Sequence, residues 1–216
     1  MNMTVLIESR DLMLATLHRR AFTDDDWLFE WKFDGFRCLV EKERERVELV
    51  SREGNSFNRS FPEVVAAVAA LPGNFAWDSE LAVGGGRGQE AFDLLQQRAK
   101  TTSPKSVPVA VRRCPARIFV FDMLASEGVD LRGRPLVERK EMLRDGFDDT
   151  PTLVYVTDVE GVGELVFEQA QIHDFEGMVA KRKASSYVRG RSRAWLKVKN
   201  PAYSRPAALG FGGGRT

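Results

Sequence analysis

The sequence predicts an α+β fold in which antiparallel-rich sheets form two lobes flanked by helices. Several segments alternate between apolar and charged residues at every second position, which indicates strands buried on one side. Segments with helical spacing separate other strands, so hairpins and helical crossovers are mixed along the chain. That mixture favours this fold over a doubly wound nucleotide-binding fold. A chain of 216 residues is long enough for one large domain or two small subdomains.

Composition and charge narrow the classes of function. Hydrophobic residues make up 43% and charged residues 29%, which is typical of a globular protein and argues against long disorder or a coiled coil. The formal charge of +1 means that any anion site must be built locally. Apolar runs stay well short of the roughly 20 residues that a membrane helix needs. We therefore expect no membrane partner. Cys38 and Cys114 lie far apart without CxxC spacing, so we expect a cytoplasmic protein without a cysteine zinc site.

The clearest alternation marks a strand over 27–34, with aromatic residues on one face and charged residues on the other. The chain then continues into a hairpin whose charged loop is expected to be the four residues 43–46. Pairing outward from that loop sets Arg37 opposite Arg52, and two opposed arginines favour a bound anion such as a phosphate between them. A slip in register would separate the two side chains.

Later elements follow the same signals. Ser60, Pro62 and Glu63 indicate a helix over 61–70, with Ser60 as N-cap and Glu63 completing a capping box. A second alternating strand places Asp78 and Glu80 on one face. The expected elements from there are a strand over 75–83, a helix over 91–99, a strand over 116–124, a helix over 135–143, a strand over 152–157, a helix over 162–173, and strands over 176–182 and 195–200. We expect one domain over residues 1–203 and a flexible, glycine-rich tail over 204–216.

Lys32 is the candidate nucleophile. It lies between Trp31 and Phe33, and partial desolvation there would lower its pKa toward that of a reactive neutral amine. Glu30 and Asp34 share its face and are placed to orient the ammonium, or to reach a metal or a sugar hydroxyl. Periodicity leaves an alternative open, since a lysine on the solvent face of an amphipathic strand is common.

Positive charge concentrates near the end of the chain. The segment 181–199 contains eight lysines and arginines and no acidic residue. Lys197 and Lys199 share a strand face with Trp195, so a phosphate chain would fit against them. The alternative is a solvated basic surface that binds nothing.

Six short motifs occur together and in a fixed order: KFDGFR at 32–37, SREG at 51–54, WDSEL at 77–81, VFDML at 120–124, EGMVAK at 176–181 and WLKVK at 195–199. They resemble the nucleotidyltransferase motifs of ATP-dependent DNA ligases, and the segments between them look most like the ligase domain of bacterial end-joining ligases. The motifs span almost the whole chain. The resemblance implies an ATP-grasp-like adenylation domain whose cofactors are ATP and Mg²⁺.

The resemblance also implies roles for single residues. Lys32 would attack the α-phosphorus of ATP to form a lysyl-AMP, which then passes to the 5′-phosphate of nicked or broken duplex DNA. The residues expected to bind ATP are Glu30, Arg37, Arg52, Glu80, Phe121, Lys181, Lys197 and Lys199. Glu176 is expected beside the metal, although it has the opposite strand parity to Lys181 and needs a kink at Gly177 or a place before the strand. The residues expected to contact DNA phosphates are Arg52, Arg182, Lys183, Arg191 and Arg193.

The sequence departs from the ligase pattern after the last lysine motif. Complete ligases continue into an OB-fold, whereas about 17 residues follow Lys199 here, too few for such a barrel. The departure puts the first step in doubt, and we expect slow nick sealing by this chain alone and an OB-fold or end-joining protein acting in trans. Two alternatives remain open at this point: an RNA ligase or capping-type nucleotidyltransferase, and a DNA-end or partner-binding module with weak catalysis.

Overall fold

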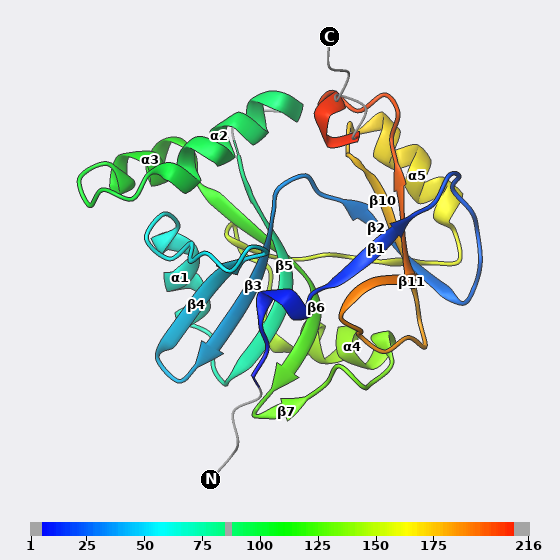
Figure 1. Cartoon of the computed structure of the whole chain (residues 1–216), viewed down its shortest axis with the longest axis horizontal. Helices are drawn as coiled ribbons and strands as arrows, with labels where there is room; N and C mark the ends of the chain where they lie inside the picture. The colour runs from blue at the N-terminus through cyan, green and yellow to red at the C-terminus, as the bar shows by residue number, and fades with distance from the viewer. Residues whose placement is uncertain (1–5, 85–87, 210–216) are drawn as a thin grey trace.

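Two sheets form the frame of the molecule (Figure 1). The computed structural model describes residues 6–84 and 88–209. One sheet has the order β1 (Met13–Leu17), β11 (Gly190–Lys199), β10 (Gly177–Arg182), β2 (Trp27–Lys32) and β9 (Val159–Glu160). The other has the order β4 (Arg46–Ser51), β3 (Phe36–Glu43), β5 (Phe75–Val83), β6 (Ala116–Ser126) and β7 (Val129–Asp130), with β8 (Leu153–Tyr155) paired to β6. Pairing is antiparallel except between β1 and β11 and between β6 and β8, so the predicted antiparallel-rich, two-lobed α+β fold is confirmed.

The helices flank the two sheets, as Figure 1 shows. They are α1 (Pro62–Ala69), α2 (Gly88–Lys100), α3 (Val107–Arg113), α4 (Leu136–Gly146) and α5 (Gly163–Ile172), with short 3₁₀ turns η1 (Ser9–Asp11) and η2 (Pro206–Leu209). Contacts run from α1, α2 and α4 to the six-stranded sheet and from α5 to the five-stranded sheet. The sequence did not predict α3 or the strands β1, β7 and β9. Among the described helices, none combines the length and the apolar character needed to cross a bilayer.

The predicted hairpin forms with the expected register but a shorter loop. Cys38 pairs with Ser51 and Glu43 pairs with Arg46, so only two residues join β3 to β4. The four-residue loop was therefore wrong, because Arg44 takes a positive φ of 54° that closes a tight turn. The ladder stops at Cys38, one residue before the expected arginine pair.

Two expectations for the start of helix α1 were wrong: Ser60 is not its N-cap, and no capping box forms. The helix α1 begins at Pro62 with Phe61 at its N-cap, and no side chain caps it. The Ser60 hydroxyl instead donates to the Ala99 carbonyl at 2.8 Å, and Glu63 pairs with the buried Arg98. Tertiary contacts with α2 thus replace the local capping box.

The charged face of β2 is also buried rather than solvated. Glu30 is 3% exposed, while Trp31 on the other face is 39% exposed and stacks on Phe175 at 4.6 Å between ring centroids. The alternation is real, but its polar face points toward the second sheet.

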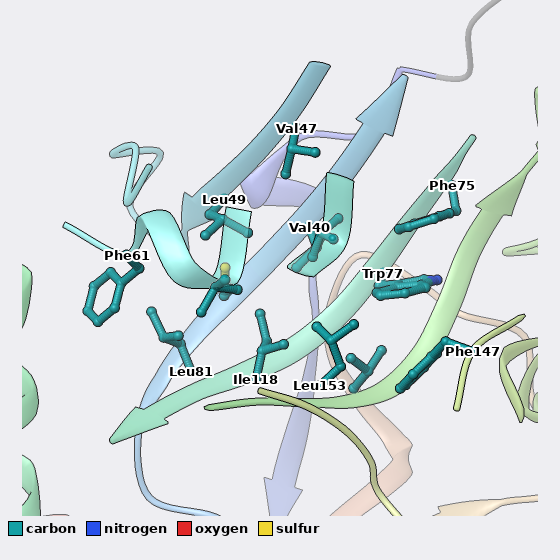
Figure 2. Packing of buried hydrophobic residues seen from close by; sticks show 14 of the residues in the cluster. Val40, Val47, Leu49, Phe61, Phe75, Trp77, Leu81, Ile118, Phe147 and Leu153 are labelled. Carbon is teal, nitrogen blue, oxygen red and sulfur yellow. The ribbon is translucent and has the colours of Figure 1, made fainter. Parts of the chain in front are cut away.

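The main core lies against the six-stranded sheet (Figure 2). Trp77 stacks on Phe75 at 3.9 Å between ring centroids and meets Phe147 at 5.0 Å. Complete burial of a large apolar side chain stabilises a fold by roughly 1.5–3 kcal/mol. A second cluster, which includes Leu39 and Trp195, joins β1 and β11 to the other sheet and fixes how the two sheets face each other.

The predicted division at residue 203 stays a prediction, but part of the expected tail makes contacts. Ser204 donates to Asp174, and Arg205 pairs with Asp34. These contacts tie the described end of the chain to the loop that precedes β10 and to the loop that follows β2.

Candidate active site

A cleft of about 560 Å³ lies between the two sheets. Strands β2, β10 and β11 of one sheet and β3, β5 and β6 of the other contribute side chains to it. Nine residues singled out from the sequence line it: Glu30, Lys32, Arg37, Arg52, Glu80, Phe121, Lys181, Arg191 and Lys197. The fold therefore brings together residues from six separate segments of the chain.

Lys32 lies at the end of β2 in this cleft. Gly177 is its partner in the neighbouring strand β10, so Glu176 sits directly beside it, with 2.6 Å between Lys32 Nζ and Glu176 Oε2. Glu176 precedes β10, and Gly177 has a φ of 146° with no room for a Cβ, which would lie 2.0 Å from the Val198 carbonyl oxygen. Glu176 therefore lies before the strand, as one expectation had it, and Gly177 has the unusual backbone that the other required. Glu176 and Lys181 can face the same cleft despite their opposite strand parity.

The protonation state of Lys32 differs from the expectation. Burial lowers its pKa, but the carboxylates of Glu176, Glu80 and Asp34 outweigh burial, so that the net pKa is raised. The expected neutral amine was wrong for the free protein, because the sequence did not show how many acidic side chains surround the ammonium.

Glu80 shares the cleft with Lys32. Burial, together with the carboxylates of Glu176 and Asp34, raises the pKa of Glu80 to about 7, although Lys32 and Arg37 act in the opposite direction. Glu80 therefore changes charge near neutral pH. Its neighbour Ser79 points away and donates to the Cys38 carbonyl, as strand parity predicts.

Arg37 is held inside the protein. Its Nε and Nη2 atoms donate to the Asp78 carboxylate, and Nη2 also donates to the Met13 carbonyl at 3.0 Å. Asp78 further accepts a hydrogen bond from the Tyr187 hydroxyl at 2.6 Å. Arg52 pairs with exposed Glu53 at 3.3 Å, so each predicted member of the arginine pair has a carboxylate partner of its own.

Aromatic rings and cations meet on the other side of the cleft. Lys181 Nζ lies 4.3 Å from the ring centroid of Phe121 and 4.4 Å from that of Trp195. Arg37 lies 4.8 Å from the Phe121 ring centroid. Burial lowers the pKa of Lys181, and Glu30 opposes this shift through a contact of 2.6 Å.

The two lysines of β11 differ in their surroundings. Lys197 lines the cleft, and burial together with the charges of Lys32 and Lys199 lowers its pKa. Lys199 Nζ donates to the Ala208 carbonyl at 2.5 Å. The shared strand face does not give both ammonium groups the same environment.

The residues expected to contact DNA differ in exposure and in their partners. Arg182, Arg191 and Arg193 are exposed, while Lys183 is half-buried and pairs with Glu160 at 2.6 Å. Arg52 and Arg191 are the members of this group that also line the cleft.

Sequence reasoning missed several residues that build the site. Lys140 contacts Glu30, Tyr187 contacts Asp78, and Arg205 contacts Asp34. Each lies outside the six motifs, and each is more than 100 positions from its partner along the chain. No local pattern points to such contacts.

The fold and the cleft together define a two-lobed nucleotidyltransferase domain. Lys32 lies in its cleft, together with other cationic side chains, carboxylates and the aromatic ring of Phe121. The model of a protein family described as "ATP dependent DNA ligase domain" matches residues 13–199. The chain belongs to that family.

Known relatives agree with this assignment. The chain is 30% identical over 200 residues to the SPbeta prophage-derived DNA ligase-like protein LigB of Bacillus subtilis, covering 92% of this chain and 70% of that protein. It is 32% identical over 185 residues to DNA ligase C of Mycobacterium tuberculosis, covering 81% of this chain and 50% of that protein. The multifunctional non-homologous end joining protein LigD of Pseudomonas aeruginosa is 30% identical, with 81% of this chain matching 20% of that protein. The chain thus spans between 20% and 70% of the length of these curated relatives.

A solved structure shows the same fold. The ligase domain of M. tuberculosis LigD superimposes with a TM-score of 0.70 at 27% identity, over 88% of this chain and 60% of that one. These matches confirm the resemblance to bacterial end-joining ligases, and they do not favour the RNA ligase or capping alternative.

Proposed function

We propose that this chain carries out the adenylyl transfer of an ATP-dependent DNA ligase. Lys32 Nζ attacks the α-phosphorus of ATP, the bond between that phosphorus and the bridging oxygen breaks, and pyrophosphate leaves. AMP then passes from Lys32 to a DNA 5′-phosphate, and a 3′-hydroxyl displaces it. The position of Lys32 in the cleft, 2.6 Å from Glu176 and on a ligase-family fold, is the observation that carries the proposal.

The charges around Lys32 suit this chemistry. The ammonium must lose a proton before it attacks, and the Glu176 carboxylate is within hydrogen-bond reach of that proton. Lys197 lines the same cleft as a cation that can stabilise charge developing on the α-phosphate. Glu80 and Phe121, from the opposite sheet, are our candidates for the ribose and for stacking on adenine.

The acidic side chains fit the expected Mg²⁺. Glu176 offers carboxylate oxygens, and Mg²⁺ is usually held by one or two carboxylates together with substrate phosphates and water. In the part of the chain that the structure describes, no three or more acidic, histidine or cysteine side chains gather into a metal cage. This fits an ion bound mainly through the nucleotide, and such an ion would offset the charge of the phosphates.

We further propose nicked or broken duplex DNA as the acceptor. Exposed Arg182, Arg191 and Arg193, with Lys183 and Arg52, are our candidates for its phosphates. An OB-fold or end-joining protein acting in trans remains part of this proposal.

Intact-mass measurement tests the first step. Incubation with ATP and Mg²⁺ should add the mass of one AMP, and Lys32→Ala should abolish the addition. Lys105→Ala, at an exposed position away from the cleft, is the matched control and should react like the parent. An adduct that survives in Lys32→Ala would overturn the assignment of Lys32, and the absence of any adduct in the parent would overturn the proposed reaction.

A further inference from the structure

Helix α4 places a buried lysine behind the cleft. The Lys140 side chain is 4% exposed, and its Nζ lies 2.6 Å from Glu30 Oε1, 2.9 Å from Asp158 Oδ1 and 2.8 Å from the Val156 carbonyl oxygen. The Tyr155 ring covers the ammonium, with its centroid 4.6 Å away. All three ammonium protons therefore have an acceptor within the protein.

Glu30 is held from two sides. Lys140 contacts Oε1 and Lys181 contacts Oε2, each at 2.6 Å. A carboxylate has about four lone-pair sites, so two contacts fix its orientation and leave acceptor capacity for a ligand. Glu30 and Lys181 line the cleft, whereas Lys140 is not among its lining residues.

The cluster is balanced in charge. Glu30 and Asp158 supply two negative charges, and Lys140 and Lys181 supply two positive charges. Burial lowers the pKa of Lys140, but Glu30 and Asp158 outweigh burial and raise it, so the lysine stays charged. A charged Lys140 in turn holds one oxygen of the Glu30 carboxylate in place through the 2.6 Å contact.

We propose that Lys140 is a positioning residue that sets the base preference of this site by fixing the orientation of the Glu30 carboxylate. The proposal rests on the proposed function, in which the cleft binds ATP, and it takes the Glu30 carboxylate in the cleft lining as the group that meets the base. Adenine presents an amino donor at position 6, where guanine presents a carbonyl acceptor. A fixed carboxylate accepts from the amino group and repels the carbonyl, so it favours ATP over GTP.

Removal of Lys140 frees one oxygen of Glu30. The carboxylate then rotates, so that it neither accepts from the adenine amino group nor repels the guanine carbonyl in a fixed direction. Discrimination between the two bases falls, while Lys32 and Glu176 keep their geometry. The change should appear mainly in KM, because the affected contact is made to a part of the nucleotide that does not react.

The experiment compares kcat/KM for lysyl-nucleotide formation with ATP and with GTP. Lys140→Gln should lower the ATP-to-GTP ratio at least tenfold, and Lys140→Arg should restore part of it. Asp158→Asn is the matched control, since it changes the same buried cluster but leaves the contact between Lys140 and Glu30; its ratio should stay within about twofold of the parent.

The double variant Lys140→Gln/Asp158→Asn guards against misfolding, because it removes one charge of each sign and leaves Glu30 paired with Lys181. It should show the same loss of discrimination as Lys140→Gln. An unchanged ratio in a folded double variant would overturn the role of Lys140, even if thermal stability fell.

Failure of the proposed function can be recognised separately. If the parent forms no adduct with ATP or GTP, the adenylyl transfer fails, and base preference is then read from equilibrium binding of the two nucleotides by calorimetry. In that measurement a lower ATP-to-GTP affinity ratio in the double variant supports the role of Lys140. An equal ratio in parent and double variant overturns it.

Discussion

Arg205 Nη2 lies 2.6 Å from Asp34 Oδ1, and this ion pair fastens the described end of the chain to the loop that follows Lys32. Both side chains are largely buried, at 11% and 9% exposed. The Tyr203 hydroxyl donates to the same carboxylate at 3.0 Å, and the Arg205 guanidinium lies 3.7 Å from the ring centroid of Phe92 on α2. The pair thus joins three separate parts of the fold.

Arg205→Ala should lower the free energy of unfolding by about 2 kcal/mol, because it leaves the buried Asp34 carboxylate with fewer charged partners. Denaturant unfolding measures the change. Arg46→Ala is the control, since Arg46 is 75% exposed and its pair with Glu48 should contribute less than about 1 kcal/mol. Equal stability of Arg205→Ala and the parent would show that the segment after residue 203 does not support the fold.

The contact between Lys32 and Glu176 predicts a change in amine reactivity. The Glu176 carboxylate raises the pKa of Lys32, so Glu176→Gln should lower that pKa and increase the neutral fraction at a given pH. Acetylation of Lys32 by a small anhydride at pH 8, followed by peptide mass spectrometry, should be several times faster in the variant. Labelling of exposed Lys105 in the same sample corrects for differences in reagent concentration between samples. Slower labelling of Lys32 in the variant would contradict the assigned cause.

Glu80 predicts a pH dependence of stability. Its pKa in the folded protein is raised to about 7, above the usual value of about 4.5 for a glutamate side chain. The folded state therefore binds more protons than the unfolded state between these values, and the contribution of Glu80 to stability falls as pH rises through this interval. Glu80→Gln should gain thermal stability relative to the parent, and by more at pH 8 than at pH 5. A constant difference in melting temperature across this range would show that the pKa of Glu80 is not raised.

The buried pair of Arg139 with Asp122 predicts the largest loss of stability. Both side chains are 0% exposed, and Arg139 Nε and Nη2 lie 2.7 and 2.8 Å from the two Asp122 oxygens. Arg139→Met leaves an unpaired buried carboxylate and should cost about 3–5 kcal/mol. In the matched variant Arg134→Ala, which breaks the exposed pair with Glu138, chemical denaturation should show a loss below about 1 kcal/mol. Similar losses in both variants would mean that burial does not govern this pair.

Much of the fold could be predicted because its signals are local. The strand over 75–83 matches β5 residue for residue, and the pairing of β3 with β4 follows from a charged turn between alternating segments. Strand β1 escaped prediction because its partner β11 lies far along the chain and pairs in parallel. The capping box at Ser60 failed for a similar reason, since contacts with α2 overrode a local preference.

The candidate site divides in the same way. Lys32, Glu80 and Lys197 stand in motifs whose spacing marks them, and the structure places all three in the cleft. Arg139 and Lys140 lie in the polar sequence VERKEM, which is typical of an exposed helix, yet both are buried. Their burial depends on how α4 packs against both sheets. The local pattern of apolar and polar residues in a single sequence does not show this packing.

The exposed arginines of strand β11 lead to a prediction of how the protein binds DNA. Arg191 and Arg193 are exposed, and only a contact of 3.4 Å from Arg191 to the Ala15 carbonyl is seen for either guanidinium among the described residues. Each replacement by alanine should weaken binding to nicked duplex DNA of any sequence and reduce the slope of log affinity against log salt by about 1. Fluorescence anisotropy over a salt series measures both effects. Arg112→Ala, on α3 at the opposite side of the molecule from β11 (Figure 1), should leave affinity and slope unchanged. If the Arg191 and Arg193 variants instead keep the parent slope, the phosphate contacts lie elsewhere, because counterion release scales with the number of phosphates that the protein neutralises.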